Sequence, residues 1–228
     1  TFIKNKYMKT VIFTTTSKNK IDDFKTFLEY KNLTNEINLL TLSDIHIPDG
    51  EAPEDCDTVE GNANQKLSYY FDRLPEEYRN SDTYLMSEDT GLFIDALGGA
   101  PGVKTARFTG SHDYKATNEK IMSLMSGELS TGRRQCTIKS CVSIVSSINK
   151  SNMYSEPFIY DDFYVTYEES KVPYFAFDSI VSPYGVRSVT LAEIGYSNKV
   201  KRLRELPRYE GFCRCMSFIG YICPEILG

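Results

Sequence analysis

The chain has 228 residues, 41% hydrophobic and 25% charged, with 14 Gly and 9 Pro, and this composition excludes collagen-like, coiled-coil and wholly disordered proteins. Its length suffices for one large domain or for two small domains that share a core. A net charge of −5 without a long basic run excludes broad nucleic-acid binding, and no apolar run reaches the roughly 18 residues of a membrane span, so we expect a cytoplasmic protein.

The predicted elements alternate between strands and helices along the chain. Short runs rich in β-branched and aromatic residues predict strands, in chain order, at residues 10–14, 36–40, 83–86, 92–94, 136–145 and 158–167. Apolar residues spaced three and four apart predict helices between them, at residues 21–28, 62–74 and 115–125. This mixture indicates an α/β or α+β protein with a mixed sheet.

The loop at residues 15–20, between the first strand and the first helix, is rich in small hydroxyl side chains. Free backbone N–H groups at the start of a helix form a cradle for anions, and Lys20 adds a positive charge there. The loop therefore suits a phosphate group, whereas the structural alternative is that Ser17 or Asn19 is simply the helix N-cap. It is not a Walker A loop, because it has no glycine.

Three carboxylates form the second candidate feature. Glu88 and Asp89 follow the strand at residues 83–86 and precede a Thr-Gly turn, and ligands gather at this end of a strand in α/β sheets. Glu54 lies in an acidic loop at residues 43–58. Because Mg²⁺ takes only one or two protein carboxylates and completes its shell with water and phosphate oxygens, these acids would suffice for a magnesium site if they converge. The alternative for each acid alone is a solvated surface charge.

Cysteine and histidine usage narrows the chemistry further. The six cysteines are too few for a disulfide scaffold, so reduced thiols are expected. Cys213, Cys215 and Cys223 do not have zinc-ribbon spacing, and buried or surface thiols are the favoured interpretation. Having only two histidines argues against a Ser-His or Cys-His nucleophile. Carboxylate, lysine and metal chemistry remains.

Residues 88–110 carry a longer pattern, Glu-Asp-Thr-Gly-Leu-Phe-Ile-Asp-Ala-Leu-Gly-Gly-Ala-Pro-Gly-Val-Lys-Thr-Ala-Arg-Phe-Thr-Gly. It resembles the signature of the inosine triphosphate pyrophosphatase family, D/E-D-S/T-G-L-x-V-D-A-L-G-G-x-P-G-x-x-S-A-R-Y/F-x-G. Residues 15–20 are similar to the family's T-G-N-x-x-K, and residues 58–66 to its T-F-x-E-N-A-x-x-K. Order and spacing agree across residues 8–110.

The resemblance implies hydrolysis of a nucleoside triphosphate between its α- and β-phosphates, which gives a monophosphate and pyrophosphate. It implies that Lys20, Lys66 and Asp89 are catalytic, with Asp89 orienting or deprotonating the attacking water. The implied metal ligands for Mg²⁺, with Mn²⁺ as a substitute, are Glu54, Glu88 and Asp89. The implied phosphate-binding residues are Thr15, Ser17, Lys20, Lys66 and Thr90. Two lysines and a divalent cation neutralise phosphate charge without covalent chemistry.

The C-terminal half resembles the family less closely. Residues 174–180, Tyr-Phe-Ala-Phe-Asp-Ser-Ile, are similar to G-F-G-Y-D-P-I, which implies that Phe175 stacks on the base and that Asp178 helps to recognise it. The alternative is an aromatic core strand. In residues 197–203, Asn198 and Lys199 stand where the family's S-H-R-x-x-A-L has His and Arg, two donors that read the purine 6-oxo group. Lysine cannot reproduce the planar fork of arginine, so these two substitutions fall on the part of the family pattern that sets base specificity.

For the fold, the resemblance implies an elongated mixed β-sheet flanked by helices, with two lobes and a central nucleotide-binding cleft. We expect the domain to span residues 8–207, with terminal extensions at residues 1–7 and 208–228, and to form a homodimer. The main hypothesis is a Mg²⁺-dependent enzyme that removes deaminated purine nucleotides. Two alternatives are a pyrophosphatase for other damaged nucleotides and an inactive interaction or regulatory module.

The start of the sequence at Thr1 has two explanations. Domains similar to this family occur inside the polyproteins of some plant RNA viruses, and excision from such a polyprotein would place the protein in the host cytoplasm. A cloning remnant explains Thr1 equally well.

Overall fold

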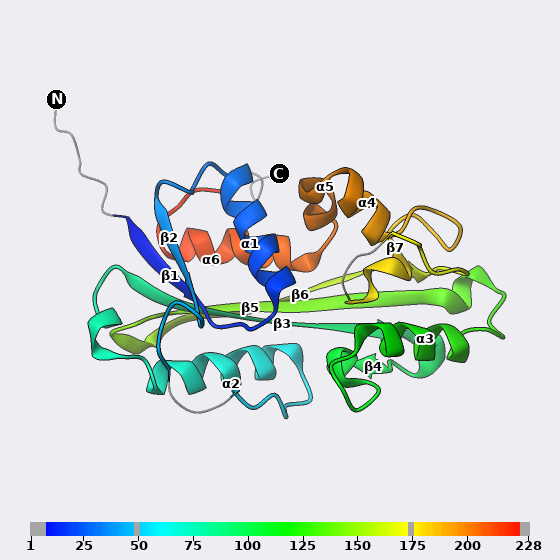
Figure 1. Cartoon of the computed structure of the whole chain (residues 1–228), viewed down its shortest axis with the longest axis horizontal. Helices are drawn as coiled ribbons and strands as arrows, with labels where there is room; N and C mark the ends of the chain where they lie inside the picture. Colours follow the sequence, from blue (N-terminus) through cyan, green and yellow to red (C-terminus); the bar gives the residue numbers. More distant parts are fainter. Residues whose placement is uncertain (1–7, 48–50, 173–175, 224–228) are drawn as a thin grey trace. The chain divides into compact units, whose positions relative to one another are not determined.

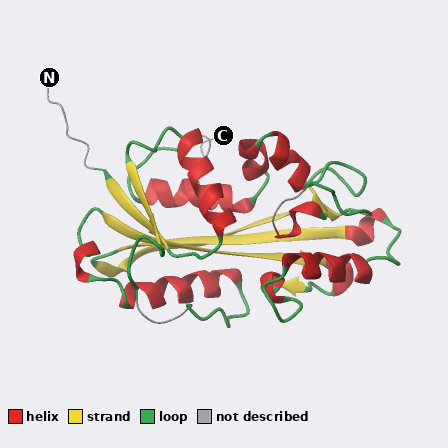
Figure 2. Ribbon diagram, in the orientation of Figure 1, coloured by secondary structure: helices red, strands yellow, loops and turns green. Residues whose placement is uncertain are grey.

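The computed structural model describes residues 8–47, 51–172 and 176–223 (Figure 1). Within these residues the strands are β1 (Lys9–Phe13), β2 (Ile37–Thr41), β3 (Thr83–Ile94), β4 (Pro101–Gly102), β5 (Gln135–Ser146), β6 (Asn149–Val165) and β7 (Val181–Ser182). The α-helices are α1 (Lys18–Tyr30), α2 (Val59–Asp72), α3 (Tyr114–Leu124), α4 (Leu191–Ser197), α5 (Lys199–Arg204) and α6 (Pro207–Phe218) (Figure 2). None of these helices is both long and apolar enough to cross a bilayer.

The strands form one mixed sheet in the order β2-β1-β3-β5-β6-β7, with β4 paired to β3. β1 lies parallel to both β2 and β3, with Thr10 opposite Asn38 on one side and Thr83 on the other. The β3–β4 and β6–β7 pairs are antiparallel. The predicted class, an α/β protein with a mixed sheet flanked by helices, is confirmed.

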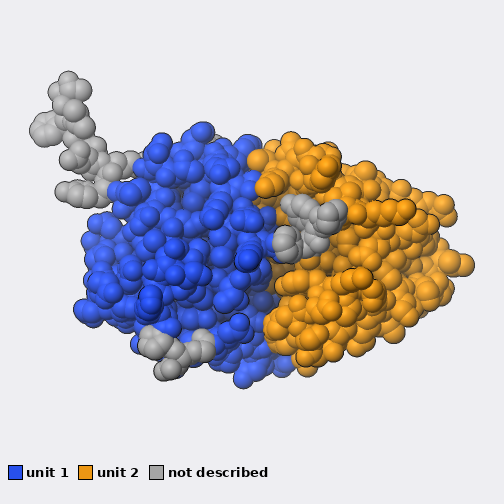
Figure 3. Space-filling view, in the orientation of Figure 1, with its two compact units in different colours: residues 1–89, 141–156, 211–228 blue, residues 90–140, 157–210 orange. Residues whose placement is uncertain are grey.

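Two compact units divide the chain (Figure 3). Unit 1 contains residues 1–89, 141–156 and 211–228, and unit 2 contains residues 90–140 and 157–210. The division falls within β3, β5 and β6, so each of these long strands contributes residues to both units. A core of its own supports each unit.

The core of unit 1 forms because α1, α2 and α6 each carry an apolar face. The predicted stripe of α2 is confirmed, since Ala63, Leu67 and Tyr70 are buried within the helix and Leu74 just after it. A second cluster joins rings whose centroids lie 4.9 to 6.2 Å apart, from Phe13, Phe24, Phe27 and Phe212. Gly211 allows α6 to approach β5, because a Cβ there would lie 2.5 Å from a methyl carbon of Val142.

The core of unit 2 lies around α3 and the C-terminal part of β3. Ile121 and Met125 pack there with Leu92 and Ile94, all fully buried. The guanidinium group of Arg134 is also buried, and it donates hydrogen bonds to backbone carbonyls of Met125, Glu128, Val165 and Thr166. A buried charge with this many acceptors is well compensated, so Arg134 is a structural residue.

The largest correction to the predicted elements concerns β3. The sequence predicts two strands, at residues 83–86 and 92–94, separated by a turn, whereas the structure has one strand of 12 residues. Glu88 and Asp89 therefore lie inside a strand rather than at its end. The polar side chains remain in the strand because other groups satisfy them: Lys20 pairs with Glu88, Asn62 donates to Asp89, and the Thr90 hydroxyl lies 2.6 Å from that of Ser140.

Other element boundaries differ by smaller amounts. β6 begins nine residues before its predicted start, and α2 begins three residues before and ends two residues before its predicted limits. The helices α4, α5 and α6 were not predicted. α4 nevertheless has a local signal, a capping box in which Thr190 accepts from the N–H of Glu193 and Glu193 accepts from that of Thr190.

Candidate active site

The first side of the candidate site is the β1–α1 loop. Thr14 Oγ1 donates to the carbonyl of Met86 at 3.0 Å, and Ser17 N–H donates to Thr15 Oγ1 at 3.2 Å. Ser17 occupies the N-cap position of α1, but its side chain makes no capping hydrogen bond. The position of the N-cap therefore fits the structural alternative, whereas its expected side-chain bond is absent. Lys20 lies in the first turn of α1.

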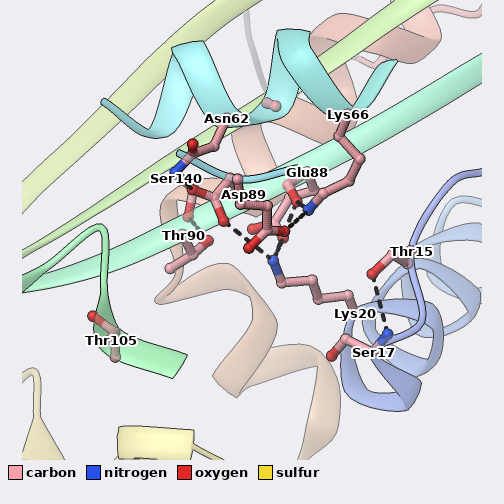
Figure 4. A network of polar contacts seen from close by, with 12 residues as sticks. Thr15, Ser17, Lys20, Asn62, Lys66, Glu88, Asp89, Thr90, Thr105 and Ser140 are labelled. Carbon is pink, nitrogen blue, oxygen red and sulfur yellow. Dashed lines mark hydrogen bonds and ion pairs between the residues drawn. The ribbon is translucent and has the colours of Figure 1, made fainter. Parts of the chain in front are cut away.

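The second side is the N-terminal half of α2. The helix begins after Thr58, whose Oγ1 accepts the N–H of Gly61 at 3.0 Å. Asn62 and Lys66 are four residues apart, which places them on one face of the helix, and both side chains point toward β3 (Figure 4). They are buried, with 0% and 6% exposure.

Between these two helices lie the carboxylates of β3. Glu88 is fully buried and Asp89 is 6% exposed. Lys20 Nζ lies 2.6 Å from a carboxylate oxygen of Glu88 and 3.9 Å from one of Asp89. Lys66 Nζ pairs with Glu54 at 2.5 Å. Both ammonium groups also donate to the backbone carbonyl oxygen of Glu88 at 3.2 Å, so the two nitrogens are separated by at most twice that distance.

Three carboxylates and two ammonium groups lie together in this cluster. Burial raises the pKa of Asp89, Lys20 and Lys66 lower it, and Glu88 and Glu54 raise it further. A carboxylate with a raised pKa is a stronger base than an exposed aspartate. The cluster is therefore suited to accept a proton and to exchange its internal ion pairs for ligand contacts.

The donor set also suits a divalent cation. Among the described residues, no three His, Cys, Asp or Glu side chains are gathered closely enough to hold a metal ion by themselves. Mg²⁺ does not require three, because it usually takes one or two carboxylates and fills its shell with water and phosphate oxygens. The adjacent buried carboxylates of Glu88 and Asp89 offer the hard oxygen ligands that this ion prefers.

The predicted phosphate-binding residue Thr90 belongs to unit 2. Its hydroxyl lies 2.6 Å from that of Ser140, and Arg208 Nη2 donates to it at 3.3 Å. Its assignment to phosphate binding stays a prediction, as do those of Thr15 and Ser17.

The base-binding prediction has a different outcome. Phe175 lies outside the described residues. Asp178 is 2% exposed and forms an ion pair with Arg202, whose Nε lies 2.6 Å from a carboxylate oxygen. Asn198 is the N-cap of α5, where its Oδ1 accepts the N–H of Lys201 at 2.9 Å. Lys199 is the exposed first residue of α5. Base recognition by these residues stays a prediction.

The alternative of an aromatic strand at residues 174–180 is wrong for the part that the structure describes. Residues Ala176–Ser179 form a 3₁₀ turn rather than a strand. Ala176 has a φ of 53°, in the left-handed region, and its carbonyl accepts from the Asn118 side chain at 2.8 Å. This turn brings Asp178 into the interior of unit 2.

Two residues of these networks were missed at the level of sequence. Asn62 donates from Nδ2 to a carboxylate oxygen of Asp89 at 3.1 Å, and its spacing of four from Lys66 is a signal that would have found it. Arg202 has no local signal, because its partner Asp178 lies 24 residues earlier.

Known proteins resemble the chain along most of its length. A family model described as the Ham1 family matches residues 11–203. A dITP/XTP pyrophosphatase of Clostridium tetani is 36% identical over 121 residues, which are 53% of this chain and 56% of that protein. One of Chlorobaculum tepidum is 28% identical over 198 residues, 83% of this chain and 84% of that protein. The first of these matches thus spans little more than half of the relative.

Solved structures share the fold. A nucleoside-triphosphatase / dITP/XTP pyrophosphatase from Mycobacterium abscessus superposes with a TM-score of 0.63 at 21% identity, covering 87% of this chain and 94% of that one. A HAM1 protein from Coxiella burnetii has a TM-score of 0.63 at 18% identity, covering 88% and 98%.

Proposed function

Because the chain belongs to the Ham1 family, we propose that it is a nucleoside triphosphate pyrophosphatase that cleaves the bond between the α- and β-phosphates. One observation carries the proposal: Lys20 and Lys66, from two different helices, both reach the carbonyl oxygen of Glu88 at 3.2 Å beside a buried carboxylate pair. Relatives named dITP/XTP pyrophosphatase support deaminated purine nucleotides as substrates and nucleotide-pool sanitising as the role.

The lysines supply the charge that this reaction needs. A triphosphate carries about four negative charges, which repel an attacking water unless cations neutralise them. Lys20 and Lys66 exchange their carboxylate partners for phosphate oxygens when the substrate binds. Thr15 and Ser17, in the loop before α1, add hydrogen-bond donors at a helix N-terminus, a favourable place for phosphate.

A divalent cation fits the same site. Of the three implied ligands, the adjacent Glu88 and Asp89 would hold Mg²⁺, with Mn²⁺ as a substitute, and Glu54 would add negative charge beside them. When bound, such an ion neutralises phosphate charge and makes a coordinated water more acidic. Asp89, whose pKa burial raises, accepts the proton of the attacking water in this scheme, because its carboxylate is a stronger base than an exposed one.

A second candidate is a broader enzyme for other damaged nucleotides. It is favoured by the contacts of two of the four residues predicted to bind the base, since Asp178 is paired with Arg202 and Asn198 caps α5. A site with fewer base-specific donors and acceptors discriminates less between bases.

We also propose that the enzyme is a homodimer, which the family resemblance supports. Sedimentation equilibrium at micromolar concentration tests this. A mass of twice 26.0 kDa is expected, and a monomer at all concentrations would contradict it.

Pyrophosphate release tests the function directly. The assay compares inosine, xanthosine, adenosine and guanosine triphosphates, with and without Mg²⁺, for the wild-type protein and for Asp89→Ala. We expect metal-dependent release from the inosine and xanthosine nucleotides, absent in the variant. Equal cleavage of the adenosine nucleotide would favour the broader enzyme, and no release from any nucleotide by the folded wild type would reject the proposed function.

A further inference from the structure

Asn62 occupies an unusual position for an amide side chain. It is fully buried, in the first turns of α2. The helix is fixed to β3 beside it, because Ser87 Oγ donates to the carbonyl of Ala63 at 2.7 Å. Asn62 therefore has little freedom to move relative to β3, and its side chain points at Asp89 (Figure 4).

Both ends of the Asn62 amide are engaged. Its Oδ1 accepts the backbone N–H of Cys56 at 2.9 Å, and its Nδ2 donates to a carboxylate oxygen of Asp89 at 3.1 Å. A backbone N–H requires an acceptor and a carboxylate requires a donor, so the amide has only one orientation that satisfies both partners. Aspartate at this position would keep the first hydrogen bond and lose the second.

The segment that Asn62 holds carries Glu54. Gln65 forms a second attachment to it, because its side chain exchanges two hydrogen bonds with Asp55, at 2.5 and 3.2 Å. The segment also packs closely on the helix, since a Cβ at Gly61 would lie 2.7 Å from the Cβ of Cys56. One buried amide thus connects the Glu54 segment to the Asp89 carboxylate.

We propose that Asn62 is a positioning residue of this site, which orients the Asp89 carboxylate and fixes the Glu54 segment relative to it. The inference rests on the proposed function. One oxygen of Asp89 is bonded to Asn62, and the other lies 3.9 Å from Lys20. Without the amide donor, the carboxylate can rotate away from the geometry that the reaction requires. Losses of such supporting hydrogen bonds reduce activity by about 10- to 100-fold.

Three variants separate this role from its alternatives. Asn62→Ala removes both hydrogen bonds, whereas Asn62→Asp removes only the donor to Asp89. Asn64→Asp is the matched control, because it adds the same charge to α2 but its Oδ1 accepts from Ser143 Oγ at 2.8 Å, a bond that aspartate keeps. The measurements are kcat and KM for inosine triphosphate with Mg²⁺, the inhibition constant of a non-hydrolysable α,β-methylene analogue, and thermal unfolding to confirm that each variant is folded.

For both Asn62 variants we expect kcat to fall by about 10- to 100-fold, while the inhibition constant changes much less and Asn64→Asp stays near the wild type. Wild-type kcat in Asn62→Asp would mean that the Asp89 contact has no role, and wild-type kcat in Asn62→Ala would mean that only the added charge matters. Either result overturns the inference, as does a loss confined to KM and the inhibition constant. An inactive wild type would reject the proposed function and this inference with it.

Discussion

The two units use buried charge in different ways. In unit 1, the ammonium groups of Lys20 and Lys66 lie among three carboxylates, and each lysine contacts more than one acceptor. In unit 2, a carboxylate oxygen of Asp178 lies 2.6 Å from Arg202 Nε, with both side chains almost fully buried. The first arrangement offers several alternative pairings, whereas the second is a short contact between two oppositely charged, almost fully buried side chains.

We interpret the first arrangement as a candidate ligand site and the second as a structural element. Carboxylates that lie close together repel one another, so such a cluster is less stable than a single pair of opposite charges, and it gains stability when a ligand binds. Functional sites commonly carry such unfavourable electrostatics, because activity rather than stability has shaped them. Substituting one carboxylate in each unit therefore tests the contrast.

The largest effect is expected for Asp89→Asn. Loss of the base should lower the rate of pyrophosphate release by about 10²- to 10⁴-fold. The free energy of unfolding should rise, because burial raises the pKa of Asp89. A carboxyl group whose pKa is higher in the folded than in the unfolded protein is disfavoured as an anion in the fold, and a neutral amide removes that penalty at neutral pH.

Urea unfolding at pH 7 and the pyrophosphate assay measure both quantities. Asp22→Asn is the control, because Asp22 is an exposed residue of α1 and its substitution should change neither. A lower free energy of unfolding for Asp89→Asn would show that Asp89 anchors the fold as Asp178 does, and the contrast between the units would fail.

The second prediction is that Asp178→Asn changes the free energy of unfolding in the opposite direction. Breaking a buried ion pair removes the carboxylate that faces the buried Arg202 charge, so the free energy of unfolding should fall by about 3 to 5 kcal/mol. Replacing both partners with neutral residues, Asp178→Asn with Arg202→Met, should recover part of that loss, because neither charge of the pair then remains buried.

A double-mutant cycle by urea unfolding checks this. The two single variants and the double variant give the coupling energy between Asp178 and Arg202. A loss below about 1 kcal/mol in the Asp178 variant, the value typical of exposed pairs, would mean that the pair is not structural and that Asp178 remains available to a base.

The sequence predicts the class of fold and most elements, because the apolar residues that repeat with a period of two or of 3.6 are the residues that the core buries. The predicted strands at residues 10–14 and 36–40 and the helix at residues 115–125 agree with β1, β2 and α3 to within about one residue. The failure at β3 has a specific cause. A run of Ser, Glu, Asp, Thr and Gly is typical of a turn, and partners that are distant in sequence make it stable in a strand.

The charged residues of the candidate site were easier to predict than the polar ones. Its lysines and carboxylates stand at fixed positions of the patterns that resemble the family, and the structure brings Lys20, Lys66 and Glu88 together. An asparagine such as Asn62 or Asn198 has many ordinary uses, so its role depends on which groups the fold places beside it. Asn62 reaches a carboxylate, whereas Asn198 caps a helix.

The smallest predicted effect concerns Asn198. The family pattern assigns it to base recognition, whereas its observed contact is that of a helix N-cap. If it is a helix N-cap, Asn198→Ala should lower the free energy of unfolding by about 1 kcal/mol, and Asn198→Asp, which can still cap, should not. Neither substitution should change the ratio of kcat/KM for inosine and adenosine triphosphates, because the cap acts on the backbone of α5.

The same two variants also test the role that the family pattern assigns to Asn198. A residue that reads the base would change the ratio by tenfold or more, since one hydrogen bond of about 1.4 kcal/mol is a factor of ten in discrimination. A changed kcat/KM ratio with an unchanged free energy of unfolding would make Asn198 a base-reading residue. Unit 2 would then hold a specificity site that the contacts of Asn198 in this structure do not indicate. An unchanged ratio with lower stability would leave selectivity to residues other than Asn198.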